Sequence, residues 1–266
     1  APGGAPDLRL RAPVTRSLEF PLGAPPLRED EMQCAPLAAN PAPAVDLGGV
    51  PVPRHLTREM ISWFPAPRSP ESLALDLGCG DLVHREIVEK AGFVYAGIDY
   101  SSPRAPILGD AHALPLAGDS IEFVLSVAVL EHLRWPFVAM REAFRVMRPG
   151  GIFIGTVAFL EPFHENSHYH HTHLGTINSL RYGGFEVVEV APSAEWTVLV
   201  AQASMGLFPR LPAPVAKAIV YPLETLQRIL WSAGSLLKPD PARRSRTRNT
   251  TGAFAFIARK PDLRPA

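Results

Sequence analysis

The feature that most constrains the fold is an alternation of short apolar runs with helix-like segments between residues 73 and 258. Leu73–Leu77 is a mostly apolar run that leads into glycines, which is typical of a strand buried in a parallel sheet. Similar runs predict strands at Phe93–Ile98, Ala105–Leu108, Ile121–Ser126, Ile152–Val157, Phe185–Val190 and Ala253–Ala258. Intervening helices are predicted at Val83–Ala91, Phe137–Met147 and Leu174–Tyr182. Repeated strand–helix units favour an α/β fold: a doubly wound, mostly parallel seven-stranded sheet with helices on both faces.

The first 70 residues differ because they hold fourteen of the 29 prolines. We expect residues 1–64 to form a small Pro-rich N-terminal module with short strands at Leu8–Arg11, Leu18–Phe20 and Gly49–Val52, and one helix within Leu56–Phe64. Residues 65–71 then form a stiff linker. Residues 72–260 form the main domain, with a helical insert at about 195–239, and 261–266 form a tail.

Charge and cysteine content exclude several classes of protein. Basic and acidic residues number 26 each, so the chain has no global electrostatic reason to bind nucleic acid. Two cysteines, Cys34 and Cys79, are too few for a disulfide framework or a four-cysteine zinc site. We see no secretory signal and no apolar stretch of about 18 residues, and therefore expect a cytoplasmic protein without a transmembrane segment.

Three candidate ligand positions follow three successive predicted strands. Gly78 and Gly80 come directly after the first strand, where glycines let the backbone approach a ligand and helix N-terminal amides face it. Asp99 ends the second strand, where a carboxylate can accept both hydrogens of a ribose diol. Asp110 follows the third strand and is placed to meet an exocyclic amine. Ligands of such sheets bind beyond the carboxyl ends of the strands, so these positions indicate a nucleotide-like pocket.

At these positions the sequence resembles the class I S-adenosylmethionine-dependent methyltransferases. The matching stretches are Ala74–Gly80, Gly97–Tyr100, Gly109–Pro115, Ser126–His132 and Arg145–Gly151. The resemblance covers about Ser72–Val190 and implies a Rossmann-like fold, S-adenosylmethionine as cofactor and S-adenosylhomocysteine as product. It implies that the cofactor contacts Asp76, Leu77, Gly78, Gly80, Asp99, Tyr100, Asp110, Ala111 and Val127. In that reading Gly78 and Gly80 pack against the methionine part and Asp99 holds the ribose. Asp110 with Ala111 holds adenine, and Val127 lines the pocket under the sulfonium.

The sequence departs from the family at one loop position, where Leu82 replaces the usual third glycine. This replacement leaves open a weaker or absent cofactor site. The short interval from Asp99 to Asp110 predicts that the usual second helix is reduced to a turn. Two other residues have plain structural alternatives: Asp76 as a helix cap or loop anchor, and Cys79 as a small apolar filler rather than a reactive thiol.

A histidine-rich segment follows the fifth predicted strand, with five of the nine histidines between His164 and His173. Imidazole is the natural base near neutral pH, so His164, and then His132, are the candidate catalytic bases. The acceptor pocket is expected to include Glu161, His168, Tyr169 and His171. Other readings stay open: the histidines order a loop, Thr172 caps the next helix, or His164, His168 and His170 bind a divalent metal, although no metal is favoured.

We therefore expect methyl transfer to an oxygen or nitrogen of a small-molecule acceptor, such as a natural product or saccharide, with a histidine base. The alternatives are a metal-assisted O-methyltransferase and a non-catalytic cofactor-binding scaffold subunit. Within the insert, Pro222 is predicted to open a helix whose apolar face comprises Leu223, Leu226, Leu230, Ala233 and Leu237. That face is expected to pack as a lid or on a sister subunit in a homodimer. Peripheral membrane contact by residues 222–248, with Trp231 and an arginine run, is the alternative.

Overall fold

The structure is a computed structural model that describes residues 45–53, 55–193, 195–237 and 248–262. The predicted strands Leu8–Arg11 and Leu18–Phe20 lie outside the described residues. The division into residues 1–64, 65–71 and 72–260 stays a prediction. Within the described part of the chain, none of the helices is both long enough and apolar enough to cross a membrane.

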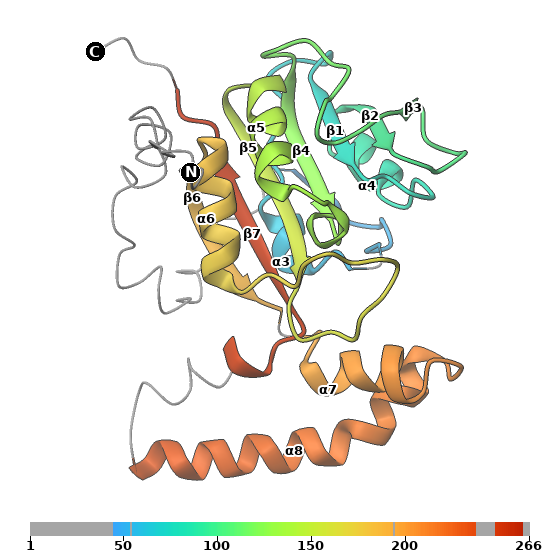
Figure 1. Cartoon of the computed structure of the whole chain (residues 1–266), viewed down its shortest axis with the longest axis vertical. Helices are drawn as coiled ribbons and strands as arrows, with labels where there is room; N and C mark the ends of the chain where they lie inside the picture. Colours follow the sequence, from blue (N-terminus) through green and yellow to red (C-terminus); the bar gives the residue numbers. More distant parts are fainter. Residues whose placement is uncertain (1–44, 54, 194, 238–247, 263–266) are drawn as a thin grey trace, which may run out of the picture.

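Seven strands form one sheet in the order β3-β2-β1-β4-β5-β7-β6 (Figure 1). Their bounds are β1 Leu73–Leu77, β2 Val94–Asp99, β3 Ile107–Leu108, β4 Ile121–Val127, β5 Met147–Ala158, β6 Glu186–Pro192 and β7 Ala253–Arg259. Strands β1 to β5 pair in parallel, whereas β7 is antiparallel to both β5 and β6. The predicted seven-stranded, mostly parallel sheet is confirmed. Chain order reverses between β1 and β4, which is where sheets of this kind bind ligands.

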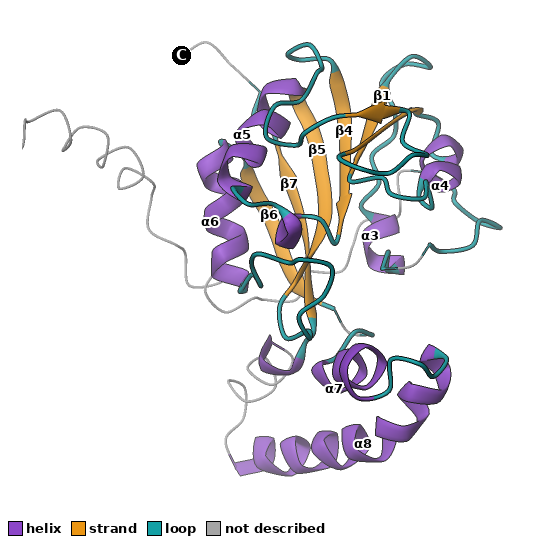
Figure 2. Cartoon of the chain, turned by 45° about the vertical axis from the view of Figure 1, so that its right-hand side comes forward, coloured by secondary structure: helices purple, strands orange, loops and turns teal. Residues whose placement is uncertain are grey.

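Helices cover both faces of the sheet, as predicted (Figure 2). Their bounds are α3 Arg58–Ser62, α4 Arg85–Lys90, α5 Pro136–Val146 and α6 His173–Gly183. Apolar residues of α5 and α6 form one buried cluster with Leu75, Val124 and Phe153 of the sheet. Residues of α3 and α4 form a second cluster with Phe123 and Ile154 on the opposite face. Both faces of β4 are therefore buried, which explains why its sequence lacks the polar alternation of a half-exposed strand.

The segment before β1 packs onto the sheet through aromatic contacts. Phe64 lies just after α3, and its ring centroid is 4.9 Å from that of Phe123 on β4. The strand predicted at Gly49–Val52 is wrong, because this stretch forms a turn followed by unpaired backbone. Gly49 has a φ of +85°, and the prolines at 51 and 53 have no N–H to donate to a strand ladder.

The insert between β6 and β7 contains a short α7, Val198–Ala201, a π-helical turn, Gln202–Leu207, and a long α8, Ala213–Leu237. It lies beyond the end of the sheet, apart from the helices that cover the sheet faces (Figure 1; Figure 2). The prediction that Pro222 opens the helix is wrong, since the helix begins at Ala213 and Pro222 lies inside it. Prolines at 212 and 214 favour the earlier start, because proline is well tolerated in a first helical turn.

The face of α8 that packs onto the rest of the insert differs from the predicted face. Ala216, Val220 and Glu224 are buried, and Glu224 accepts a hydrogen bond from the Thr197 hydroxyl, which caps α7. Leu223, Leu226 and Leu230 are instead 53%, 50% and 62% exposed. The expectation that these leucines pack as a lid on this chain is therefore wrong. Their contact with a second copy or a membrane stays a prediction.

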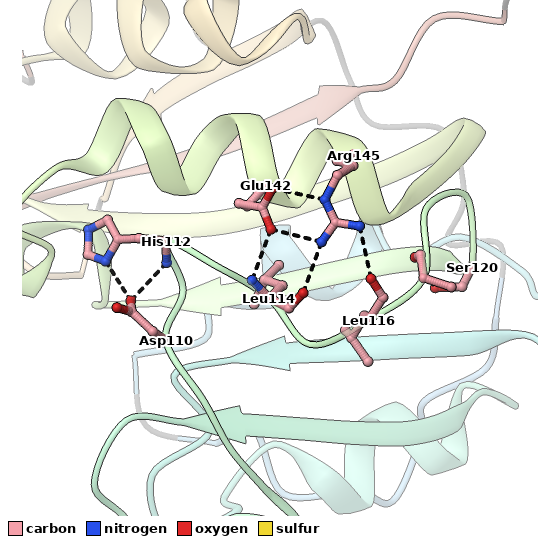
Figure 3. A network of polar contacts seen from close by, with 8 residues as sticks. Asp110, His112, Leu114, Leu116, Ser120, Glu142 and Arg145 are labelled. Carbon is pink, nitrogen blue, oxygen red and sulfur yellow. Dashed lines mark hydrogen bonds and ion pairs between the residues drawn. The ribbon is translucent and has the colours of Figure 1, made fainter.

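The loop after β3 is held by an ionic network on α5 (Figure 3). Arg145 donates to both carboxylate oxygens of Glu142, each at 2.8 Å. It also donates to the carbonyl oxygens of Leu114 and Leu116, while Glu142 accepts from the Leu114 N–H at 2.9 Å. Because Arg145 neutralises Glu142 at close range, it lowers the pKa of that carboxyl below its usual range. Between β2 and β3 the chain forms only bends and turns, so the predicted loss of a helix there is confirmed.

We expect Arg145→Ala to lower the free energy of unfolding by about 1 kcal/mol, because four hydrogen bonds are lost from a partly exposed network. The matched control is Arg85→Ala, which removes an exposed i,i+4 pair with Glu89 and should change little. Urea denaturation of both variants measures the difference. Equal effects would contradict a role for Arg145 in holding the loop.

Candidate functional site

The loop after β1 takes a path that only small residues allow at its first turn. Gly78 has a φ of +75°, and a Cβ atom there would lie 2.4 Å from Cγ2 of Val129. The N–H groups of Gly78 and Cys79 both donate to the Ile98 carbonyl oxygen, which folds the loop back over β2. Gly80 has a φ of +47°, and a Cβ there would meet nothing within 4 Å. The loop therefore presents an open backbone surface at Gly80 that a ligand can approach.

Leu82 occupies the position of the missing third glycine and adopts the conformation that glycine favours, with a φ of +64°. Its backbone N–H donates to the Cys79 carbonyl oxygen at 2.8 Å. A left-handed non-glycine residue costs roughly 1–2 kcal/mol. The loop thus keeps a path typical of glycine despite the substitution.

Asp99, at the end of β2, holds this loop in place. Its Oδ2 accepts from the Gly80 N–H at 3.1 Å, and its Oδ1 accepts from the N–H groups of Ser101 and Ser102 at 2.9 and 2.8 Å. Partial burial alone would raise the pKa of Asp99, but the three backbone donors outweigh it and lower the pKa below its usual range. The carboxylate is therefore ionised at neutral pH beside the open surface at Gly80, as a ribose ligand requires.

Two residues expected to contact cofactor, Asp76 and Leu77, have side chains that point into the interior. Asp76 is 1% exposed and accepts from the Tyr95 hydroxyl at 2.7 Å, with His84 Nδ1 at 3.4 Å from the same oxygen. Leu77 is part of the apolar core. Burial, with the charges of Asp76 and Asp99, raises the pKa of the Cys79 thiol to about 12, which matches a filler rather than a nucleophile.

The remaining predicted cofactor residues lie at the ends of β2, β3 and β4. Asp110 Oδ1 accepts from the backbone N–H and from Nδ1 of His112, and these bonds lower the pKa of Asp110 (Figure 3). Because Nε2 of His112 accepts from the Trp135 N–H, the proton is assigned to Nδ1. Tyr100 is 80% exposed, Ala111 is partly buried, and Val127 is buried at the end of β4.

A cavity of about 780 Å³ opens beside these residues. It begins at Ala128, the residue after Val127, and its walls come from the ends of β4 and β5, residues 55–57, the histidine-rich loop and the insert. Gly78, Gly80, Asp99 and Asp110 do not line it. The glycine-loop side and the cavity are thus separate regions that meet near Val127 and Ala128.

The histidine-rich loop is held at three points, by Gly252 before β7, by Ala158 at the end of β5 and by the turn after β4. The N–H of Phe159 donates to the Gly252 carbonyl oxygen, and the N–H of His171 donates to that of Ala158. In the middle, the N–H groups of His168 and Tyr169 both donate to the Glu131 carbonyl oxygen, at 2.6 and 3.1 Å. These bonds hold the loop over the short helical turn Leu130–His132 that follows β4.

This arrangement brings His164 to His132, the two predicted bases, at the wall of the cavity. Their ring centroids are 5.2 Å apart. Glu131 joins them, and one ligand atom of each of the three residues lies within 4.8 Å of the others. Burial, and then the charge of Glu161, raises the pKa of the Glu131 carboxyl to about 8. Burial and the neighbouring His164 lower the pKa of His132.

Of the four predicted acceptor-pocket residues, only Glu161 lines the cavity. Its Oε1 accepts from Nε1 of Trp196 at 2.6 Å, and burial raises its pKa. His168 and Tyr169 are exposed, and the Tyr169 hydroxyl donates to the Arg134 carbonyl oxygen. His171 is buried outside the cavity wall, and burial lowers its pKa to about 4. Thr172 caps α6 as predicted, accepting from the Gly175 N–H.

Sequence reasoning missed Glu131 and Trp196. Glu131 lies within a matched stretch, next to His132, but nothing in its local pattern distinguishes it from a surface glutamate. The predicted metal set of His164, His168 and His170 does not form a close group of ligand atoms among the described residues: the ring centroids of His164 and His170 are 6.1 Å apart, and His168 and His170 are exposed. The group that the described residues form is Glu131, His132 and His164.

Comparisons with known proteins agree with the sheet order and the loop geometry. Residues 75–155 match a family model described as a methyltransferase domain. A Mycolicibacterium smegmatis protein named "Probable S-adenosylmethionine-dependent methyltransferase" is 32% identical over 91 residues, 30% of this chain and 35% of that protein. An uncharacterized methyltransferase of Mycobacterium ulcerans is 34% identical over 113 residues, 36% of this chain and 44% of that protein.

Residues 75–155 therefore resemble a methyltransferase domain, and the sheet order agrees with the class I fold of such domains. The chain spans 35% and 44% of the length of these two relatives. A solved structure of a "putative methyltransferase" from Bacillus halodurans covers 76% of this chain and 97% of its own, with a TM-score of 0.51 and 14% identity. That likeness supports the fold alone. The cofactor of this methyltransferase class is S-adenosylmethionine, and the open surface at Gly80 beside the ionised Asp99 fits it.

We expect Asp99→Asn to weaken S-adenosylmethionine binding by roughly ten- to a hundredfold, because an amide nitrogen cannot accept a ribose hydroxyl proton. The matched control is Asp81→Asn in the same loop, whose side chain is 74% exposed. Isothermal titration calorimetry with S-adenosylmethionine and S-adenosylhomocysteine measures both variants. Unchanged affinity in folded Asp99→Asn would place the ribose elsewhere.

Replacing Leu82 separates backbone strain from side-chain packing. We expect Leu82→Gly to keep or raise the free energy of unfolding by up to about 1 kcal/mol, because relief of the left-handed strain exceeds the added chain entropy. Leu82→Val should lower it by roughly 1 kcal/mol, since β-branched residues tolerate positive φ poorly. Chemical denaturation compares them. A larger loss in the glycine variant would show that packing of the Leu82 side chain dominates.

Proposed function

We propose that the chain transfers a methyl group from S-adenosylmethionine to an oxygen or nitrogen atom of a small-molecule acceptor, such as a natural product or a saccharide. The observation that carries this proposal is the cavity of about 780 Å³ that begins beside Val127 and has Glu131, His132 and His164 in its wall. Its volume lies within the usual range of small-molecule pockets, roughly 300–1,000 Å³.

Bound S-adenosylmethionine supplies a methyl group on a positively charged sulfur. The acceptor atom must lie in line with the new bond, opposite the sulfur, so the cavity walls chiefly align the acceptor. When the acceptor atom forms its bond to the methyl carbon, the carbon–sulfur bond breaks and its electron pair stays on sulfur. The acceptor proton must then be taken up, and the imidazoles of His164 and His132 are the bases we assign among the wall groups with lone pairs, which also include the carboxylates of Glu131 and Glu161.

These imidazoles can act in two ways. An imidazole can accept the proton itself, which requires only the histidines. Alternatively, the histidines can hold a metal ion that lowers the pKa of an acceptor hydroxyl, which also requires Glu131. Because Glu131 lies close to both histidines, a metal-assisted O-methyltransferase is the second candidate function.

A non-catalytic cofactor-binding subunit is the alternative from another class of protein. The leucine at position 82 was the sequence feature in its favour, but the loop retains a glycine-like path at that residue. The polar residues Glu131, His132 and His164 in the cavity wall also favour a catalytic function over a purely binding one. A cytoplasmic location, the absence of nucleic-acid binding, homodimer formation and membrane contact by residues 222–248 stay predictions.

The test combines cofactor binding with product formation. The protein is titrated with S-adenosylmethionine and then incubated with a panel of hydroxyl- and amine-bearing small molecules, and S-adenosylhomocysteine and methylated product are measured by mass spectrometry. Binding with turnover on an acceptor supports the enzyme. Binding without turnover on any acceptor supports the scaffold, and no binding contradicts both.

Once an acceptor has been identified, His164→Gln should lower kcat by roughly 10²–10⁴-fold. Cofactor affinity should stay unchanged, because His164 lines the acceptor cavity and not the glycine loop. His168→Gln is the matched control, since His168 is exposed in the same loop and does not line the cavity. Steady-state kinetics and calorimetry on both variants measure this. Full turnover in His164→Gln would remove the histidine from the mechanism.

A further inference from the structure

We propose that Glu131, His132 and His164 form a binding site for a divalent first-row metal ion in the wall of the acceptor cavity. The site has two nitrogen ligands and one oxygen ligand, a set that suits Zn²⁺, Mn²⁺ or Fe²⁺ rather than a soft monovalent ion. Its role in presenting an acceptor rests on the proposed function. Binding of the ion itself does not.

The positions of the three ligand atoms allow one ion to contact them all. They lie within 4.8 Å of one another, whereas metal–ligand bonds of about 2.0–2.2 Å need ligand atoms roughly 3–3.5 Å apart. Side-chain shifts of about 1 Å close that difference. His132 and Glu131 are adjacent on the helical turn after β4, and His164 reaches them from the loop that is fixed to the Glu131 carbonyl oxygen.

The hydrogen bond that His164 makes through Nδ1 leaves its other ring nitrogen, Nε2, able to bind a metal ion. Its Nδ1 lies 2.9 Å from the Pro162 carbonyl oxygen and therefore carries the proton, so Nε2 keeps its lone pair. A metal-bound histidine commonly donates its other N–H to a backbone carbonyl in this manner. Nδ1 of His132 is buried and has no hydrogen-bond partner within the described residues.

Glu131 is the observation that distinguishes a metal site from a histidine base. Its side chain is in the cavity wall but only 1% exposed, and its Oε2 has no hydrogen-bond partner among the residues that the structure describes. In the same part of the chain, no lysine or arginine forms an ion pair with it. Backbone N–H groups of Glu131 and Ala158 hydrogen-bond to the carboxylate, but they do not balance its charge, and a buried charge without a counterion is costly. The ring nitrogens of His132 and His164 lie beside this carboxylate, so a metal cation is the partner that can contact all three groups.

A metal ion here would serve the acceptor rather than the cofactor. Methyl transfer is an in-line displacement that depends on alignment, and the glycine loop and Asp99 lie outside the cavity that holds the cluster. Three protein ligands leave further coordination positions open toward the cavity. An acceptor hydroxyl or carbonyl oxygen can occupy one of them and be oriented by it.

The test measures metal binding directly on the whole chain. Protein dialysed against EDTA is titrated with ZnCl₂ and, separately, with MnCl₂ by calorimetry, and bound metal is counted by mass spectrometry after desalting. We expect one equivalent of one of these ions to bind. Glu131→Gln and His164→Gln should each weaken binding by roughly a hundredfold or more, since loss of second-shell partners alone costs 10–100-fold.

The control is the double variant His168→Gln/His170→Gln, which removes the exposed histidines of the same loop and should bind metal as the wild type does. Circular dichroism and S-adenosylmethionine titration confirm that each variant is folded. Wild-type protein that binds neither ion, Glu131→Gln that binds as tightly as wild type, or loss of binding only in the double variant would each overturn the site. If S-adenosylmethionine still binds in those cases, only the metal site is refuted and the proposed methyltransferase function stands. If S-adenosylmethionine does not bind either, the proposed function fails as well.

Discussion

The pairing of β1 with both β2 and β4 is the constraint on which the rest of the structure depends. Strands that follow β1 are added first on one side and then on the other, so the loops after β1 and β4 leave the sheet side by side and in opposite directions. Apolar side chains buried on both faces hold this pairing. The opening between the two loops needs no special residue, because it follows from the strand order. The candidate functional residues lie on the loops that border this opening.

Each of these loops is held in place by a few charged or polar groups. Asp99 holds the glycine loop through three backbone N–H groups, and Arg145 with Glu142 holds the loop after β3. The Glu131 carbonyl oxygen holds the histidine-rich loop. These groups accept or donate several bonds each, so a small number of side chains orders long stretches of irregular backbone. A rigid sheet with pinned loops is the arrangement that alignment-dependent methyl transfer requires.

The sequence predicted the parts of the fold that depend on local pattern. All seven strands were found within a few residues, because buried parallel strands read as apolar runs, and Thr172 was identified as a helix cap. The start of α8 was misplaced because Pro222 resembles a helix start, although tertiary contacts of Ala216 and Val220 continue the helix through it. The resemblance to the methyltransferase family placed Asp76 at the cofactor, whereas its side chain is buried in the structure. Its partners Tyr95 and His84 are distant in sequence and give no local signal. For the same reason Glu131 could not be distinguished from a surface residue.

The two halves of the site also differ in where their residues come from. The cofactor side lies within residues 75–155, the segment that matches the methyltransferase family. Most of the cavity wall lies outside that segment: residues 55–57, the loop after β5, and the insert with Trp196 and Lys217. Glu161 joins two of these parts by accepting from Trp196, and Glu224 joins α8 to α7 through Thr197. The paired ends of β5 and β7 supply another part of the wall, through residues such as Val157 and Ala255. The predicted cofactor residues and the cavity wall thus come largely from different segments of the chain, which fits the general rule that function resides in sites attached to a fold rather than in the fold itself.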